Sequence, residues 1–392
     1  MAFNFDYYAP TEVVFGRKTE EEVGTYLKKY GASRVLVVYG SERVRKNGLL
    51  RTIEDQFSAN DIVYTFLGGV VPNPRLDKVY EGITKGKQIS ADFILAVGGG
   101  SVIDTAKAIA YGIAEPELDV WSLYDGSRQA QKCMPVGVVL TIAAAGSETS
   151  MGSVITDDRT MEKRAYDDNL ARPKFAIMNP ELTLSLPDYQ TEAGATDVMM
   201  HTMERYFTQG GNMDITDTIA EGLLRNVMKS ALILHEDPQN YDQRAELMWS
   251  GSISHNGLTD CGTDGGDWST HMLEHELSGA FDVTHGAGLA AIWPTWARYV
   301  CSSDLPRFVK FATNVIGVEE NGTPEEIAEK GIQGMEDFYH KIGMPVNITE
   351  MGISLTEAQC QELAASCAKA AGGPQGSAKA LLQSDMYQIY KT

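Results

Sequence analysis

Short apolar runs and amphipathic segments alternate along the first half of the chain. The apolar runs are rich in β-branched residues, and each is followed by a stretch in which apolar positions recur at helical spacing. This alternation is typical of parallel strands joined by crossover helices. The pattern predicts strands at Val35–Tyr39, Ile62–Phe66, Phe93–Val97, Val136–Thr141 and Lys174–Met178.

The strand pattern ends near residue 185, and the remainder of the chain has helical periodicity. Pro187 followed by Asp188 indicates the start of a helix. Further helices are expected at Ile215–Leu234, Asn240–Asn256, Leu305–Val315, Pro324–Ile342 and Thr356–Lys369. A length of 392 residues exceeds what one core usually supports. We therefore expect an α/β domain with a parallel, Rossmann-like sheet over residues 1–185 and an all-helical domain over residues 186–392.

Composition narrows the classes of function. The net charge is −20, and such an acidic surface repels phosphate backbones, so nucleic acid is not an expected partner. No apolar run approaches the length of a membrane span, and the first residues lack the features of an export signal. The five cysteines are scattered and odd in number, which favours reduced thiols. A cytoplasmic enzyme is expected.

A glycine-rich turn follows the strand predicted at Phe93–Val97. Gly98, Gly99, Gly100 and Ser101 join this strand to an alanine-rich helix. Glycines let the backbone approach a ligand closely, and the unpaired N–H groups at a helix start bind phosphate. Since ligands bind outside the carboxyl ends of parallel strands, a pyrophosphate is expected on Gly99, Gly100 and Ser101. A tight turn that binds nothing is the alternative interpretation.

Two pairs of metal-ligating residue types lie downstream, each pair at helical spacing. Asp197 and His201 form the first pair, and His271 and His275 form the second, with His285 ten residues further on. Residues four apart lie on one face of a helix, and imidazole with carboxylate suits zinc or ferrous iron. Ordinary helical histidines are the alternative. Spacing alone does not decide which of His271 and His275 would ligate a metal.

These segments together resemble the iron-containing alcohol dehydrogenase family, and its butanol dehydrogenase and broad aldehyde reductase branch most of all. The resemblance covers nearly the whole chain. It is carried by Phe5–Gly16, Gly68–Pro74, the glycine turn with Asp104, Thr141–Glu148, Asn179–Thr183, the Asp197 and His201 pair, Gly265–Trp268 and His285–Gly286. It implies a fold like that of dehydroquinate synthase, one bound divalent metal and a nicotinamide cofactor. Relatives are commonly homodimers.

The resemblance also assigns residues. It implies four metal ligands, Asp197, His201, His271 and His285, with Fe²⁺ expected and Zn²⁺ as the alternative. It places His275 beside the nicotinamide and the substrate without ligating the metal. The cofactor contacts that it implies are Gly40, Ser41, Asn73, Gly98, Gly99, Gly100, Ser101, Asp104, Thr141, Ser147 and Leu182.

The expected chemistry follows from these assignments. A divalent metal with one open position acts as a Lewis acid on an alcohol or aldehyde oxygen while hydride passes to or from the nicotinamide. Three neutral imidazoles and one carboxylate leave a net positive site that favours an oxyanion. Asp264 and Asp267 are candidates to orient the ligand imidazoles, with loop or capping roles as the alternative.

Cofactor choice is predicted from the end of the first strand. An acid there would hydrogen-bond the ribose 2′-OH and repel a 2′-phosphate. Relatives that prefer NAD tend to carry Asp where this chain has Gly40, and Ser41, Arg43 or Arg45 offer partners to a phosphate. Glu42 opposes this interpretation unless it faces solvent. We expect NADP(H) to be preferred over NAD(H).

Two other functions compete with a dehydrogenase. A lyase of the dehydroquinate synthase type would recycle its nicotinamide, but few basic residues lie near the expected metal segments to bind an anionic substrate. A non-catalytic nucleotide- or metal-binding module is the other. Bulky apolar residues indicate a small aliphatic alcohol or aldehyde as substrate, although each suits core packing equally: Trp268, Met272, Phe281 and Trp293.

Overall fold

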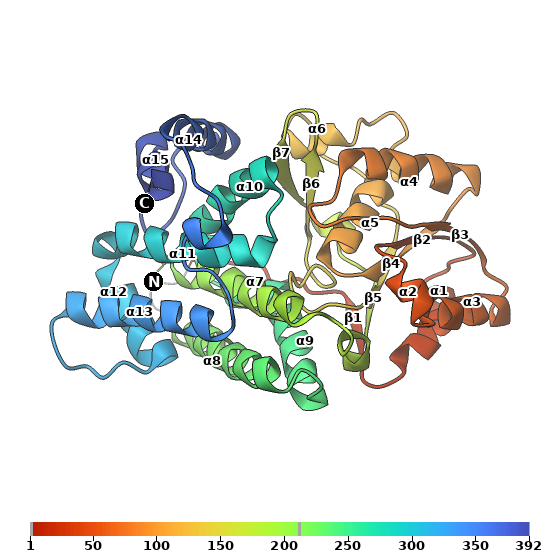
Figure 1. The fold of residues 1–392 in the computed structure, drawn as a ribbon. Coiled ribbons are helices and arrows are strands. Elements are labelled where there is room, and N and C mark those ends of the chain that lie inside the picture. Colours follow the sequence, from red (N-terminus) through yellow and green to blue (C-terminus); the bar gives the residue numbers. More distant parts are fainter. Residues whose placement is uncertain (1–2, 211–212, 392) are drawn as a thin grey trace. The chain divides into compact units, whose positions relative to one another are not determined.

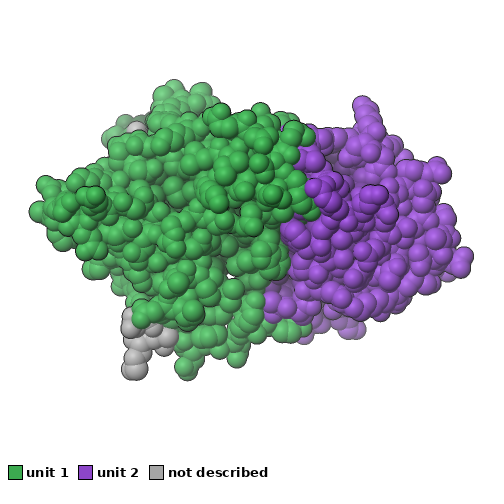
Figure 2. Space-filling view, turned by 90° about the horizontal axis from the view of Figure 1, so that it is seen from below, with its two compact units in different colours: residues 1–8, 187–392 green, residues 9–186 purple. Residues whose placement is uncertain are grey.

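The structure is a computed structural model that describes residues 3–210 and 213–391 (Figure 1). Contacts within the chain divide it into two compact units, which Figure 2 distinguishes by colour. The α/β unit comprises Ala9–Leu186. The helical unit comprises Pro187–Thr392 together with the N-terminal residues up to Tyr8.

The α/β unit is built on a six-stranded parallel sheet with the order β1-β8-β5-β4-β2-β3. Its four inner strands read as continuous apolar runs because a parallel sheet is covered on both faces. The strands are β1 (Glu12–Phe15), β2 (Arg34–Tyr39), β3 (Val63–Leu67), β4 (Phe93–Gly98), β5 (Val136–Leu140) and β8 (Phe175–Met178). The five predicted strands and the predicted fold class are confirmed.

Three strands were not predicted from the pattern. β1 is a four-residue edge strand that pairs with β8, with Glu12 opposite Phe175. β6 (Gly152–Asp157) and β7 (Glu162–Asp167) form an antiparallel pair outside the main sheet. The segment Glu162–Asp167 is largely polar, so it lacks the apolar alternation that marks a half-buried strand.

Helices connect the strands of the α/β unit, as the crossover pattern requires. They are α1 (Val23–Lys29), α2 (Arg43–Lys46), α3 (Leu49–Ala59), α4 (Leu76–Gln88), α5 (Gly100–Ala114) and α6 (Trp121–Tyr124). One face of the sheet packs on α1 and α3 through a core that includes Phe57, Phe93 and Phe175. On α5 ten residues are buried, which accounts for its alanine-rich sequence.

The helical unit contains nine α-helices within its described residues. They are α7 (Asp188–Tyr206), α8 (Asp214–Glu236), α9 (Tyr241–His255), α10 (Ser269–Phe281), α11 (His285–Val300), α12 (Leu305–Phe311), α13 (Pro324–Lys341), α14 (Glu357–Ala371) and α15 (Gln383–Lys391). The five helices expected from periodicity are all present. Capping boxes at Thr323 and Thr356 set the starts of α13 and α14.

An aromatic cluster forms part of the core of the helical unit. Phe207 stacks on Phe308 with ring centroids 4.5 Å apart and meets Trp296 edge-on at 5.5 Å. Trp293 is 1% exposed and packs against Phe207 and Phe311. Trp293 is therefore a core residue, which corrects the expectation that it could line a substrate pocket.

The observed division of the chain differs from the expected one at the N-terminus. The sequence assigned residues 1–185 to the α/β domain, but the segment up to Tyr8 groups with the helices. The backbone N–H of Phe3 donates to the carbonyl of Gly262, at 3.0 Å, and so ties this segment to the helical unit. Among the described residues, no helix combines the length and apolarity needed to cross a membrane.

Candidate metal centre and cofactor-binding loops

Helix α7 carries the first two candidate ligands at its centre. Asp197 and His201 lie one turn apart on one face, and both are at most 5% exposed. Nearly every residue of α7 from Thr191 onward is buried, because α8, α9 and α11 pack around it. A helix buried on all sides has no solvated face for ionisable groups, so these side chains face protein.

Helices α10 and α11 bring two further imidazoles to the same place. His271 lies in the first turn of α10 and His285 is the first residue of α11. The Nε2 atoms of His271 and His285 each lie 3.8 Å from Asp197 Oδ1, and His201 Nδ1 lies 3.4 Å from it. The four residues expected from the family resemblance are therefore brought together.

The donor atoms of this cluster fit a metal ion. Asp197 Oδ1, His201 Nδ1 and His271 Nε2 are buried and have no hydrogen-bond partner among residues 3–210 and 213–391. Such atoms are rare unless something absent satisfies them. Tetrahedral ligands at about 2.1 Å from a metal stand roughly 3.4 Å apart. The observed separations of 3.4–3.8 Å are close to that value.

Burial and neighbouring carboxylates set the protonation of the imidazoles in opposite directions. Burial lowers the pKa of His201 well below its ordinary value, and the neighbouring His255 and His271 lower it further. Burial also lowers the pKa of His271, but Asp197 and Glu204 outweigh that effect and raise it to about 9. The carboxylates around His271 thus favour a positive charge at this position.

Two glutamates that the sequence did not single out contact the ligand imidazoles. Glu204 Oε1 lies 2.9 Å from His271 Nδ1, and Glu274 is hydrogen-bonded to His285 Nδ1. Both were detectable in principle, since Glu204 follows Asp197 by seven residues and Glu274 follows His271 by three. Those spacings keep each glutamate on the face of its helix that carries the ligand.

Asp264 and Asp267 have other partners, which corrects the role expected for them. Asp264 accepts hydrogen bonds from Thr208 Oγ1 (2.5 Å) and Gly266 N (3.1 Å). Asp267 accepts from Ser269 N (3.1 Å) and Ala378 N (2.8 Å). Burial, assisted by the charge of Glu204, raises the pKa of Asp267 to about 7. Both aspartates hold loops together rather than imidazoles.

His275 stands beside the cluster without joining it. Its ring centroid is 5.6 Å from that of His285 and 6.3 Å from that of His271. Its donor atom lies within 4.8 Å of those of Glu274 and His285, whereas the donor atom of His271 groups with those of Asp197 and His201. His285 contacts both groups, since its Nε2 also lies 3.8 Å from Asp197 Oδ1. This geometry distinguishes the two histidines of α10, which their spacing alone could not do.

A fifth imidazole near the centre was also missed. His255, at the end of α9, lies edge-on to His201 with ring centroids 4.0 Å apart. Trp268 lies 5.3 Å from His271, and the Arg205 guanidinium stacks over the indole at 4.6 Å. His255 follows an ordinary helical segment, so no spacing signal marks it in the sequence.

Two glycines allow the helices to approach α7 closely. A Cβ on Gly286 would lie 2.0 Å from the carbonyl oxygen of Ala193, and one on Gly266 would lie 2.6 Å from that of Glu204. Gly266 also has a φ of +84°. Because glycine has no Cβ, another group can come close to its backbone. In each case what approaches is the backbone of α7.

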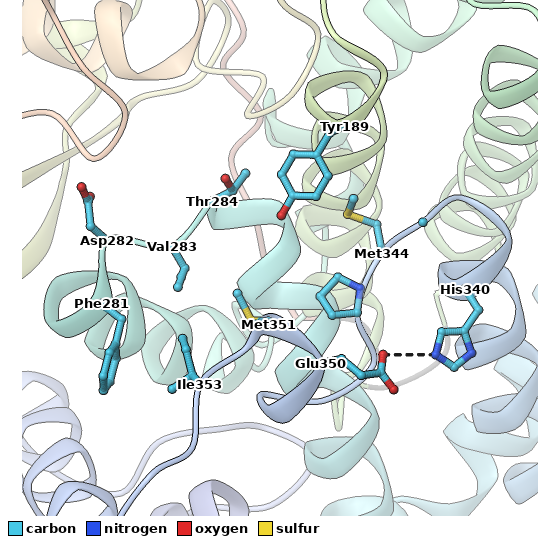
Figure 3. Close-up of a pocket in the computed structure, with 12 residues that line it drawn as sticks. Tyr189, Phe281, Asp282, Val283, Thr284, His340, Met344, Glu350, Met351 and Ile353 are labelled. Atoms are coloured by element: carbon cyan, nitrogen blue, oxygen red, sulfur yellow. Dashed lines mark hydrogen bonds and ion pairs between the residues drawn. The ribbon is translucent and has the colours of Figure 1, made fainter.

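A pocket of about 740 Å³ adjoins the turn between α10 and α11 (Figure 3). Phe281, Val283 and Thr284 line one part of it, and the segment Gly343–Ile353 lines another. Thr284 immediately precedes His285. Of the four bulky residues expected near a substrate, Phe281 lines this pocket.

The loops expected to bind the cofactor lie along one edge of the sheet in the α/β unit. Gly40 follows β2, Gly98 ends β4, and Thr141 follows β5. Gly99 precedes the first residue of the 15-residue helix α5. A Cβ on Gly99 would lie 1.9 Å from Ile142 Cγ2, so tight packing requires glycine there, in addition to any ligand.

Asp104 and Ser147, both expected to contact the cofactor, bind one another. Ser147 Oγ donates to Asp104 at 2.6 Å, and Val154 N donates to the same carboxylate at 3.0 Å. The buried Lys107 donates to the carbonyls of Ser147 (2.8 Å) and Gly152 (2.6 Å). These contacts shape the loop after β5. Asn73 is buried with φ of +51°, and Leu182 packs against the sheet core.

Comparison with known proteins decides the family. The family description "Iron-containing alcohol dehydrogenase" matches residues 10–180, and its C-terminal counterpart matches residues 191–392. The chain belongs to the iron-containing alcohol dehydrogenase family.

Individual relatives agree over the full length. The chain is 37% identical to NADH-dependent butanol dehydrogenase A of Clostridium acetobutylicum, over 99% of both chains. It is 32% identical to NADPH-dependent aldehyde reductase YqhD of Escherichia coli, over 89% of both chains. The crystal structure of NADH-dependent butanol dehydrogenase A from Thermotoga maritima superposes with a TM-score of 0.95 at 37% identity, covering 100% of this chain and 98% of that one.

Membership of this family confirms the predicted class of function. The chain is an NAD(P)-dependent alcohol dehydrogenase or aldehyde reductase, and the lyase and the non-catalytic module are not favoured. A pyridine nucleotide and a metal are its cofactors.

Replacing Gly286 with alanine tests the close approach of α11 to α7. The added Cβ would meet the Ala193 carbonyl at 2.0 Å, and that backbone cannot rotate away. We expect a loss of about 1–3 kcal/mol in the free energy of unfolding, typical of an overpacked core. Urea unfolding of the two proteins measures the difference.

Gly222→Ala in α8 is the matched control, because an added Cβ there would meet only the Arg225 side chain, at 4.0 Å. Helix propensity makes that change neutral or stabilising. Equal stability of Gly286→Ala and the original protein would contradict the close packing.

Proposed function

We propose that this enzyme interconverts small aliphatic aldehydes and alcohols at a divalent metal held by Asp197, His201, His271 and His285. The convergence of buried donor atoms on Asp197 Oδ1 carries the proposal. Fe²⁺ is the expected ion and Zn²⁺ the alternative, since both accept imidazole and carboxylate. When bound, the metal supplies Lewis-acid polarisation of the substrate oxygen.

The names of the relatives support the class of substrate. One is a butanol dehydrogenase and another is an aldehyde reductase, so short aliphatic substrates are proposed for this chain. Net oxidation of reduced cofactor in the presence of butyraldehyde would test this. A lyase would leave the cofactor concentration unchanged. A homodimer in the cytoplasm is part of the proposal.

His275 is proposed to face the nicotinamide and the substrate and to relay a proton. Its position 5.6 Å from the His285 ring, and the grouping of His271 rather than His275 with Asp197, support a role next to the metal rather than on it. A group in that position can transfer a proton to or from the substrate oxygen as the hydride moves.

The cofactor is proposed to lie along the glycine-lined edge of the sheet. The N-terminus of α5 at Gly99, Gly100 and Ser101 offers N–H groups and a positive dipole to the pyrophosphate. The neighbouring ends of β2 and β5 place Gly40, Ser41 and Thr141 at the same edge. The remaining proposed contacts are Asn73, Gly98, Asp104, Ser147 and Leu182.

We propose that the enzyme prefers NADP(H) and that the turn after β2 determines this preference. Glu42, the residue that would repel a 2′-phosphate, is ion-paired to Arg45 at 3.3 Å and accepts a hydrogen bond from Tyr39 at 3.2 Å. Arg43 Nη2 has no hydrogen-bond partner among the described residues, so a phosphate at this turn would supply one. Relatives with both preferences are known, so this turn rather than the family must decide.

Removing a proposed metal ligand should abolish metal binding without abolishing dinucleotide binding. We expect His271→Ala and His285→Ala to lose both bound metal and turnover. Dinucleotide binding should persist, because the proposed contacts lie in the α/β unit. Elemental analysis and fluorescence titration with reduced cofactor measure the two properties.

The control is His235→Ala, a histidine of α8 whose side chain is 39% exposed and hydrogen-bonded to Glu192. It should retain metal and activity. Full turnover by demonstrably metal-free His271→Ala protein would refute the Lewis-acid mechanism.

Replacing His275 should impair chemistry while leaving the metal in place. We expect His275→Ala to lower kcat by roughly two to four orders of magnitude if the imidazole relays protons. Metal content per chain, measured on the same preparation, should be unchanged. Loss of metal would show that His275 is a ligand, and a small change in kcat would leave it only a packing role.

Replacing Gly40 should shift cofactor preference. A Cβ there would lie 3.3 Å from the Val70 carbonyl, which is tight but adjustable, and Gly40→Asp adds a carboxylate where the 2′-phosphate is proposed to lie. We expect the ratio of kcat/KM values to move toward NAD(H) by roughly 10–200-fold. Gly40→Ala is the control, because it adds the bulk without the charge. An unmodified enzyme that already favours NADH tenfold would overturn the proposed preference.

A further inference from the structure

Glu204 connects α7 to the first turn of α10. Its carboxylate Oε1 accepts a hydrogen bond from the His271 backbone N–H at 2.9 Å and lies 2.9 Å from His271 Nδ1. Its side chain is 1% exposed. The Glu204 carbonyl also accepts from Asp267 N at 2.7 Å, so the loop before α10 is held at the same point. One residue of α7 thus fixes both the backbone and the ring of His271.

Glu274 makes the equivalent connection from α10 to α11. Its fully buried carboxylate is hydrogen-bonded to His285 Nδ1 and accepts from Ser278 Oγ. A Cβ on Gly288 would lie 2.8 Å from Glu274 Oε1, so glycine leaves room for the carboxylate. Gly288 and Ser278 thus accommodate the Glu274 carboxylate.

These contacts determine which nitrogen of each imidazole is available. A carboxylate only accepts hydrogen bonds, so Nδ1 of each ring keeps its proton when a bound cation takes the place of any proton on Nε2. The lone pair is then on Nε2, which in both His271 and His285 lies 3.8 Å from Asp197 Oδ1. The glutamates therefore select the tautomer and turn each ring toward the same point.

The glutamates also change the charge of the centre. Asp197, Glu204 and Glu274 place three carboxylates in this buried region, where the buried Arg205 adds one guanidinium. The sequence alone indicated a net positive site, because it counted one carboxylate. Uncompensated buried charge is costly, so each additional carboxylate favours occupancy by a cation.

We propose that Glu204 and Glu274 are positioning residues of the metal centre. Glu204 on α7 orients the ligand at the start of α10, and Glu274 on α10 orients the ligand at the start of α11. Their charge strengthens metal binding. This inference rests on the proposed ligand set. Partners of ligating histidines typically affect metal affinity by about 10–100-fold when removed.

The test is metal binding by the full-length, metal-stripped protein, measured by titration with Co²⁺ and followed by its visible absorption. We expect Glu274→Ala and Glu204→Ala to weaken Co²⁺ binding by about 10–100-fold and to alter the spectrum. Glu274→Gln and Glu204→Gln retain an oxygen that accepts from Nδ1–H. They should keep the original spectrum and lose less affinity. Glu276→Gln, a buried glutamate of the same helix, is the matched control and should bind as the original protein does.

The outcomes separate this inference from the proposed function. If His285→Ala binds Co²⁺ as tightly as the original protein, the ligand set is wrong. If His285→Ala loses binding while both alanine variants keep the original affinity and spectrum, the positioning role is overturned. Should the alanine variants not fold, ¹⁵N NMR of the Zn²⁺-loaded protein decides: a proton on His285 Nδ1 supports the inference, and a metal on Nδ1 overturns it.

Discussion

The helical unit depends on holding donor atoms from three helices around one carboxylate oxygen. Asp197 Oδ1 is buried at the centre of α7, and His271 and His285 reach it from the starts of α10 and α11. Helix backbones must come very close for this to happen. Gly266 and Gly286 permit it, because a side chain at either position would collide with the backbone of α7. The same close packing of helices therefore builds the proposed metal centre.

In the α/β unit, too, residues expected to contact a ligand are needed for packing. The glycine turn after β4 serves the sheet as well as any ligand, since Gly98 and Gly99 have no space for a Cβ beside Val102 and Ile142. The buried Lys107 holds the loop after β5 through backbone carbonyls, and burial lowers the pKa of this lysine to about 8. Residues that resemble ligand contacts in the sequence thus also serve as structural connections.

The local pattern of apolar and polar residues was enough to predict most of the strands and helices. The apolar runs from Val35 to Met178 produced the predicted parallel strands, because strands covered on both faces must be apolar throughout. Periodicity located several helices, and Pro187 marked the start of α7. The spacing of Asp197 and His201 placed two ionisable groups on one helix face, and the ordered motifs indicated the family. Short or polar elements such as β1 and β7 carried too little apolar signal.

Tertiary structure decided the rest. His271 and His275 have the same spacing signal, and only the approach of α10 to α7 directs one ring, and not the other, toward Asp197. The same approach brings Glu204 to His271, and the packing of α11 on α10 brings Glu274 to His285. Asp264 and Asp267 instead accept hydrogen bonds from loop residues. Periodicity states which face of a helix a residue occupies. Which neighbour meets that face depends on packing between residues far apart in the chain.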